Sequence, residues 1–313
     1  MEKNDLEFNV ISWYETDQNL DEDSDNTKSN KFKNYSDEYV LRMFGRTLDG
    51  KSVCVRLDNF TPHFYVKIFA RWSDREIDKF VSELKNMNKK FNDSLVGYEV
   101  ATKYDLHFGF CGKKKFKFVK LVFNSMIASK SYARIINSQS IKLQGIEAKP
   151  IKLETFESKI DPFIRLIHLK DLDSGGWILL PAGKYEKNLL DVTNTDINVR
   201  IMWNDIEPFT KEIRGLAPFI IASYDIETIS IDGSFPQAHR ISDKIVSICT
   251  TFTKYGSDEI IKSSAIGLGS STKIANADEQ EMYQTEEEVL LAWRDLIIRE
   301  DPDIITGYNI FFF

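Results

Sequence analysis

The sequence predicts two domains, an α+β domain over residues 1–216 and an α/β domain over residues 217–313. A chain of 313 residues exceeds the length at which a single hydrophobic core usually stops growing. In its first part, short alternating strands are mixed with amphipathic helices. From Ala217 onward the order is three strands, a helix and a further strand, and the helical crossover can return the last strand parallel to the first.

The first domain combines strand patterns with two helical patterns. Alternating polar and apolar residues, with a hairpin turn at Asp49-Gly50, indicate strands at Phe8–Trp13, Glu38–Phe44, Ser52–Leu57, Pro62–Lys67 and Phe116–Phe123. Apolar residues at helical spacing indicate helices at Asp74–Met87 and Met126–Ile136. A later stretch, Gly175–Tyr185, has turn residues around a short apolar strand, but its glycines lack the spacing of a phosphate-binding loop.

The second domain shows clearer boundaries. Strands are expected at Phe219–Glu227, Lys244–Phe252 and Asp258–Ala265, followed by a polar loop at Gly267–Asp278. Thr285 and Glu288 match a capping box, so a helix should begin there and end before Pro302. Asp303–Thr306 then fits a buried strand that pairs with the first strand of this domain.

Composition excludes several classes of protein. With 42% hydrophobic and 28% charged residues the chain has an ordinary globular composition. No apolar run approaches the roughly 18 residues of a membrane span, and the first residues lack the order of a secretory signal. The three cysteines and four histidines are scattered, which argues against a disulfide framework or a zinc site and favours a reducing, intracellular location.

Charge is unevenly distributed along the chain. The net charge is −7, and the first 36 residues carry nine acidic residues and four lysines, which leaves the remainder close to neutral. Because Thr16–Ser36 is acidic and has few apolar residues, we expect a flexible segment there.

A basic and aromatic stretch at Cys111–Lys120 has two interpretations. Lysines at positions 113, 114, 115, 117 and 120 could neutralise phosphates while the intervening phenylalanines stack on bases. The same alternation also arises in a half-buried hairpin with a solvated lysine face and a buried phenylalanine face. Both interpretations stay open at this stage.

Asp225 and Glu227 are the candidate metal-binding residues. They lie two apart at the end of the strand Phe219–Glu227, so both side chains point to one face of the sheet. We expect this strand to be buried, so that the charge of both carboxylates at its end would be costly without a cation or hydrogen-bond donors. Neighbouring carboxylates repel each other, and divalent cations relieve that repulsion in sites for phosphoryl chemistry. Such a pair also occurs at ordinary solvated strand ends, so the pattern becomes specific only in combination with other motifs.

Those other motifs identify a family. Asp225-Ile-Glu227 resembles the first exonuclease motif of family B DNA polymerases, and Gly307–Phe313 resembles the opening of the second. The likeness is to the delta-type catalytic subunit of eukaryotes and its relatives in large DNA viruses. Four upstream stretches resemble the N-terminal domain of that type: Arg42–Gly50, Pro62–Tyr65, Phe108–Phe110 and Leu180–Tyr185.

The resemblance implies a replicative DNA-directed DNA polymerase with a 3′→5′ proofreading exonuclease of ribonuclease H-like fold. It implies two Mg²⁺ or Mn²⁺ ions, with Asp225 bridging both and Glu227 binding one and orienting the attacking water. Asn309 would contact the 3′-terminal nucleotide of the primer. Lys113, Lys114 and Lys115 become candidate contacts to the single-stranded template. Phe311–Phe313 would pack either around the displaced strand end or in the core.

The resemblance also indicates an incomplete exonuclease domain. In the family, the residue after Phe313 is the second-motif aspartate, another metal ligand. We therefore expect this chain by itself to lack polymerase and appreciable exonuclease activity. We also expect it either to be poorly soluble or to depend on a second chain, with the remainder of the polymerase or a complementing chain as its partner. A sliding clamp is a further expected partner, and the nucleus or a cytoplasmic viral replication site the expected location. The alternatives are a non-catalytic nucleic-acid-binding or assembly module, or the first half of a split polymerase.

Overall fold

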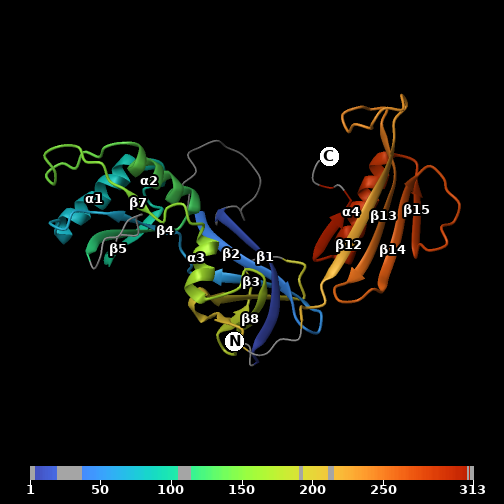
Figure 1. Ribbon diagram of the computed structural model, residues 1–313, viewed down its shortest axis with the longest axis horizontal. Helices are drawn as coiled ribbons and strands as arrows, with labels where there is room; N and C mark the ends of the chain where they lie inside the picture. Colours follow the sequence, from blue (N-terminus) through green and yellow to red (C-terminus); the bar gives the residue numbers. More distant parts are fainter. Residues whose placement is uncertain are drawn as a thin grey trace.

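The computed structural model describes residues 4–19, 37–104, 114–189, 193–210, 215–308 and 310. Its strands form three sheets of seven, four and five strands. In Figure 1 the seven-stranded sheet lies in the middle, with the four-stranded sheet and its helices on one side and the five-stranded sheet on the other. The predicted mixture of strands and helices is confirmed, with strands in the majority.

The seven-stranded sheet has the order β11-β8-β1-β2-β3-β10-β9. Its strands are β1 (Leu6–Asn19), β2 (Asp37–Arg46), β3 (Ser52–Asp58), β8 (Gly176–Leu180), β9 (Tyr185–Lys187), β10 (Ile197–Met202) and β11 (Glu207–Pro208). The predicted hairpin is confirmed, since β2 and β3 pair antiparallel and Gly50 in their turn has a φ of 88° that favours glycine. Helix α3 (Pro162–Lys170) contributes Leu166 to the core of this sheet, and a 3₁₀ turn, η2 (Trp203–Asp205), precedes β11.

The four-stranded sheet has the order β5-β6-β4-β7. Its elements are β4 (His63–Lys67), α1 (Asp74–Met87), η1 (Lys89–Phe91), β5 (Leu95–Tyr104), β6 (Lys115–Phe123), α2 (Met126–Ser138) and β7 (Thr155–Phe156). The period of apolar residues determines how α1 packs, because Ile77, Phe80 and Leu84 fall on one face and are fully buried against the sheet. The other face of the sheet carries a smaller cluster of Tyr65, Phe118 and Phe156.

The five-stranded sheet has the order β15-β14-β13-β12-β16. Its elements are β12 (Ile220–Ile229), β13 (Lys244–Lys254), β14 (Ile260–Leu268), β15 (Glu279–Tyr283), α4 (Glu286–Glu300) and β16 (Ile304–Gly307). The parallel pairing of β16 with β12 is confirmed, as is the capping box of Thr285 and Glu288. Strand β15 was not expected from the sequence; it pairs parallel to β14.

Two expectations are wrong in part. The strand β16 is not buried, because Ile305 keeps 46% of its surface exposed at the edge of the sheet. The flexible acidic segment was expected to begin at Thr16, yet β1 continues to Asn19 and Asp17 hydrogen-bonds the backbone of Met126 and Ile127. Residues 20–36 lie outside the described residues. In the part of the chain that the structure describes, no helix is long and apolar enough to cross a membrane.

Candidate functional site

Asp225 and Glu227 lie near the end of β12, on the face of the sheet that α4 does not cover. The opposite face of β12 is fixed by packing: Ala222 is fully buried, and the Tyr224 ring lies 5.0 Å from the Trp293 ring of α4. Because side chains alternate along a strand, this packing places both carboxylates on the uncovered face. The expectation that they share a face is therefore met by the geometry of β12.

The environment of the carboxylates differs from the sequence prediction. We expected a buried strand end where unneutralised charge is costly, but both side chains are exposed. The cause is that β12 and β13 continue beyond α4 as a long hairpin, which leaves residues 225–229 uncovered (Figure 1). Water can therefore hydrate both charges, and desolvation does not drive cation binding here.

The polar partners of the two carboxylates are few. Asp225 Oδ1 accepts a hydrogen bond of 3.1 Å from the Ile226 N–H. Among the residues that the structure describes, no lysine or arginine forms an ion pair with Asp225 or Glu227. Two adjacent carboxylates without a cationic side chain suit a hard divalent cation. The described ranges hold no group of three or more His, Cys, Asp or Glu side chains that could bind a metal, so the pair supplies only part of a coordination shell.

A β-bulge and a cysteine also shape this end of β12. The register with β13 shifts between Glu227 and Thr228, and bulges of this kind re-aim side chains next to active sites. Cys249 of β13 lies directly opposite Asp225 of β12. Desolvation, and then the charges of Asp225 and Glu227, raise the pKa of the Cys249 thiol. Neither feature was evident from the sequence.

Strand β16 brings the second motif beside the first. In the parallel register Tyr224 lies opposite Gly307. A Cβ atom at Gly307 would lie 2.5 Å from the Tyr224 carbonyl oxygen, so the close approach of the two strands requires glycine there. Tyr308, which follows, is 87% exposed. Asn309 and Phe311–Phe313 lie outside the described residues, so their proposed roles stay predictions.

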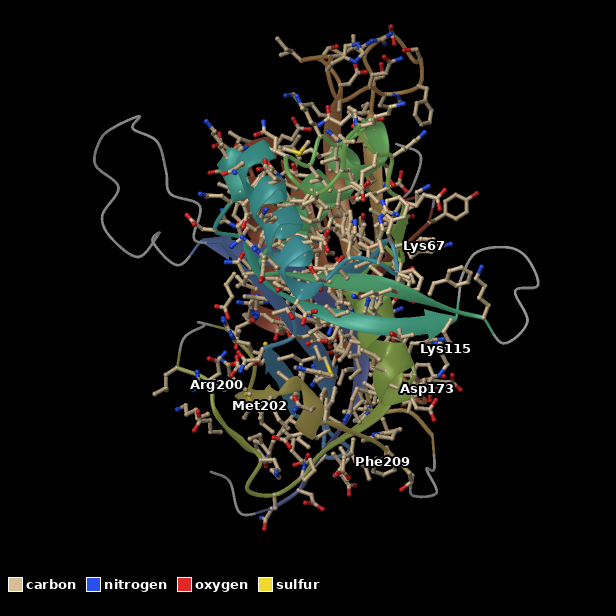
Figure 2. All side chains as sticks on the ribbon, turned by 90° about the vertical axis from the view of Figure 1, so that its left-hand side faces the viewer. Lys67, Lys115, Asp173, Arg200, Met202 and Phe209 are labelled. Atoms are coloured by element: carbon tan, nitrogen blue, oxygen red, sulfur yellow. The ribbon has the colours of Figure 1, made fainter. Side chains whose placement is uncertain are left out.

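The lysine stretch lies on the four-stranded sheet, in a different lobe from the carboxylates (Figure 1). Lys113 lies outside the described residues, whereas Lys114 directly precedes β6 and Lys115 begins it. The Nζ atoms of Lys114 and Lys67 lie 5.1 Å and 4.1 Å from the centre of the Phe116 ring. Lys67 and Lys115 lie near the same edge of the molecule in Figure 2.

The aromatic residues of this stretch do not form an open stacking surface. Phe118 is 1% exposed and packs edge-on against Phe156. Lys103, which the sequence did not single out, covers the Tyr65 ring with its ammonium 4.2 Å from the ring centre. Phe118 is thus buried as the half-buried strand predicts, but Lys117 shares its face with the buried Val119 and Leu121 and donates to the Trp72 carbonyl at 2.6 Å, so the lysines do not form one solvated face. The contact of Lys113, Lys114 and Lys115 with DNA stays a prediction.

A match to a family model identifies the family of the chain. The model for "DNA polymerase family B, exonuclease domain" matches residues 153–313. The chain belongs to family B of the DNA polymerases. Within this family it is similar to the DNA polymerase of Acanthamoeba polyphaga mimivirus, with 33% identity over 98% of this chain and 17% of the relative. It is also similar to the DNA polymerase delta catalytic subunit of Arabidopsis thaliana, with 32% identity over 87% of this chain and 25% of the relative.

A solved structure supports the same fold. The family B DNA polymerase of the archaeon Pyrobaculum calidifontis aligns with a TM-score of 0.59 at 16% identity, covering 97% of this chain and 30% of that one. This chain spans only 17% of the length of the mimivirus polymerase and 25% of the length of the Arabidopsis thaliana subunit. The resemblance drawn from the two exonuclease motifs and the upstream stretches is confirmed.

Proposed function

We propose that this chain is the N-terminal part of a replicative DNA-directed DNA polymerase and that its β12 carries half of a 3′→5′ proofreading exonuclease site. The proposal rests on one observation above the others: Asp225 and Glu227 share the uncovered face of β12, beside the parallel strand β16 that leads into the second motif. Three antiparallel strands, β12 to β14, and the parallel return of β16 after α4 support a ribonuclease H-like sheet, to which β15 is added at the far edge. We place the boundary between the N-terminal and exonuclease domains at residues 216 and 217.

The proposed chemistry assigns a role to each carboxylate. Two bound Mg²⁺ or Mn²⁺ ions would supply the activation of water and the stabilisation of the leaving oxygen. Asp225 would contribute oxygen ligands to both ions, and Glu227 would bind one ion and orient the attacking water. Because hard cations take six or more oxygen ligands, these two side chains need further ligands to hold a pair of ions firmly. A non-catalytic module is less well supported, since nothing in the packing of β12 requires two exposed carboxylates.

The proposed DNA contacts lie on two separate surfaces. Asn309, next to the end of β16, would contact the 3′-terminal nucleotide of the primer. Lys113, Lys114 and Lys115 would contact phosphates of the single-stranded template. Since the aromatic rings near these lysines are largely covered, the template contact would depend on charge and carry little sequence preference. A sliding clamp, and a nuclear or cytoplasmic viral replication site, complete the proposed setting.

Manganese binding tests the carboxylate assignment. The chain would be titrated with Mn²⁺ and the free ion measured by electron paramagnetic resonance. Asp225→Asn and Glu227→Gln should each weaken binding, because each removes one charge and one ligand from the same ion. Asp258→Asn makes the same chemical change at an exposed turn and should leave binding unaltered. Equal Mn²⁺ affinity in the wild type and the Asp225→Asn and Glu227→Gln variants would refute the assignment.

Salt dependence tests the template contact. The logarithm of the affinity for single-stranded DNA falls with the logarithm of salt concentration by about 0.7 per neutralised phosphate. The double change Lys114→Glu and Lys115→Glu should therefore weaken binding and flatten that slope by about 1.4 if both lysines meet phosphates. A matched control is Lys89→Glu with Lys90→Glu, an exposed pair in η1, just after the end of α1. If both double variants lost the same affinity for single-stranded DNA, the loss would come from net charge and not from a contact at Lys114 and Lys115.

A further inference from the structure

A buried ion pair joins the seven-stranded sheet to the five-stranded sheet. Arg46, the last residue of β2, places its Nε 2.7 Å from Oδ2 of Asp303, the residue directly before β16. The two side chains are only 9% and 10% exposed. Burying two charges is costly, and the attraction between them offsets that cost only when further hydrogen bonds satisfy both groups.

Those further hydrogen bonds are present on both sides of the pair. Arg46 Nη1 donates to the Gly50 carbonyl at 2.6 Å, so one guanidinium holds the β2–β3 turn and Asp303 together. Asp303 Oδ2 also accepts from the Ile220 N–H at 2.7 Å, and the Asp303 N–H donates to the Ile220 carbonyl at 2.9 Å. Asp303 therefore hydrogen-bonds both the N–H and the carbonyl of Ile220, and its carboxylate also pairs with Arg46.

The junction lies where the two candidate motif strands begin. Ile220 is the first residue of β12, which carries Asp225, and the parallel register starts with Ile221 opposite Ile304. A strand has a nearly fixed rise per residue, so the point at which two paired strands begin determines which residues face each other farther along. The contacts at Asp303 thus determine how Gly307 lies beside Tyr224.

Two further hydrogen bonds lie close in the chain or in the sheet to the charged pair. Asn9 of β1 is 1% exposed, lies opposite Arg46 in the β1–β2 register, and accepts a hydrogen bond of 3.2 Å from the Ala217 N–H. Asn194 donates to the carboxylate of Asp301 at the end of α4, at 2.8 Å. These contacts support the same placement, but only Arg46 reaches the strand start itself.

We propose that Arg46 is a positioning residue for the exonuclease site, acting through Asp303 on the relative placement of β12 and β16. This role of Arg46 rests on the proposed function, but the placement of the two strands can be tested without metal or nuclease activity. Arginine suits this position because its planar fork donates to the carboxylate and the Gly50 carbonyl together. A lysine ammonium is a point charge and lacks this planar fork.

Hydrogen exchange of the full chain, resolved by residue, tests the inference. In Arg46→Met, the amides of Ile220 and β16 should exchange at least about tenfold faster, since their local opening becomes easier. Amides between β13 and β14 should keep their wild-type rates, because these strands do not contact the pair. Arg46→Lys should give an intermediate acceleration at Ile220, since it keeps the charge and loses the planar fork of the guanidinium.

A double variant separates positioning from general stability. Arg46→Met with Asp303→Leu removes both charges and leaves an apolar contact, so the midpoint of global unfolding should stay near that of the wild type. The Ile220 amide should still exchange faster, because it has lost its carboxylate acceptor. Uniform acceleration over all strands of the sheet, or unchanged exchange at Ile220 in both variants, would overturn the inference. Neither outcome depends on whether Asp225 and Glu227 bind metal.

Discussion

Asp17 joins two of the sheets by capping a helix from a distant strand, and its removal should destabilise α2. Asp17 lies in β1, yet its Oδ1 accepts from the Met126 N–H at 2.7 Å. Its Oδ2 accepts from the Ile127 N–H at 2.8 Å and from the Ser125 hydroxyl at 2.9 Å. These N–H groups are the unpaired donors of the first turn of α2, where the helix dipole also favours a negative charge.

The magnitude follows from those contacts. A hydrogen bond to a charged group contributes about 1.5–3 kcal/mol when buried, and an N-cap residue contributes about 0.5–2 kcal/mol. Ile127 is exposed, so water can replace one of the bonds, and Ser125 keeps its own cap bond of 3.1 Å from the Ala128 N–H. We expect Asp17→Ala to cost about 2–3 kcal/mol and Asp17→Asn about half of that, since an amide has one acceptor oxygen.

Urea unfolding followed by circular dichroism would measure the loss. Because a chain with several sheets need not unfold in one step, hydrogen exchange of the α2 amides would show where the loss occurs. The exposed Asp258→Asn is the matched control. A cost below about 0.5 kcal/mol for Asp17→Ala, the size of ordinary surface substitutions, would refute the reasoning.

Two further predictions concern local electrostatics and capping. Burial, and then the nearby charge of Arg165, lower the pKa of His63 from 6.5 to about 4. The folded state therefore favours neutral His63, and this contribution to stability should be present above pH 6.5 and lost as the pH falls toward about 4. Unfolding free energies across that range should fall less steeply in His63→Gln than in the wild type. Separately, Thr285→Ala should lower the unfolding free energy by about 1 kcal/mol, because it removes the cap of α4, whereas Thr285→Ser should restore most of it; equal losses in the two variants would contradict the capping role.

Much of the local structure could be predicted because it depends on residues close together in the chain. The apolar period over Asp74–Met87 gives one buried stripe, and α1 has those same bounds. Thr285 and Glu288 are three residues apart, so their capping box forms wherever the helix lies. Asp225 and Glu227 share a face because alternation along β12 is a local property.

The sequence by itself therefore determined α1, α2 and α4, most of the strands, the β12–β16 crossover and the pair of carboxylates with its family, but not α3. Only the tertiary structure decided what surrounds them. Four features depend on segments far apart in the chain: the exposure of both carboxylates, the exposure of β16, the capping of α2 by Asp17 and the pairing of Arg46 with Asp303. Hydrophobic periodicity reports which face of an element is apolar, but not which distant element covers it, and a polar side chain carries no local signal of the partner it will meet.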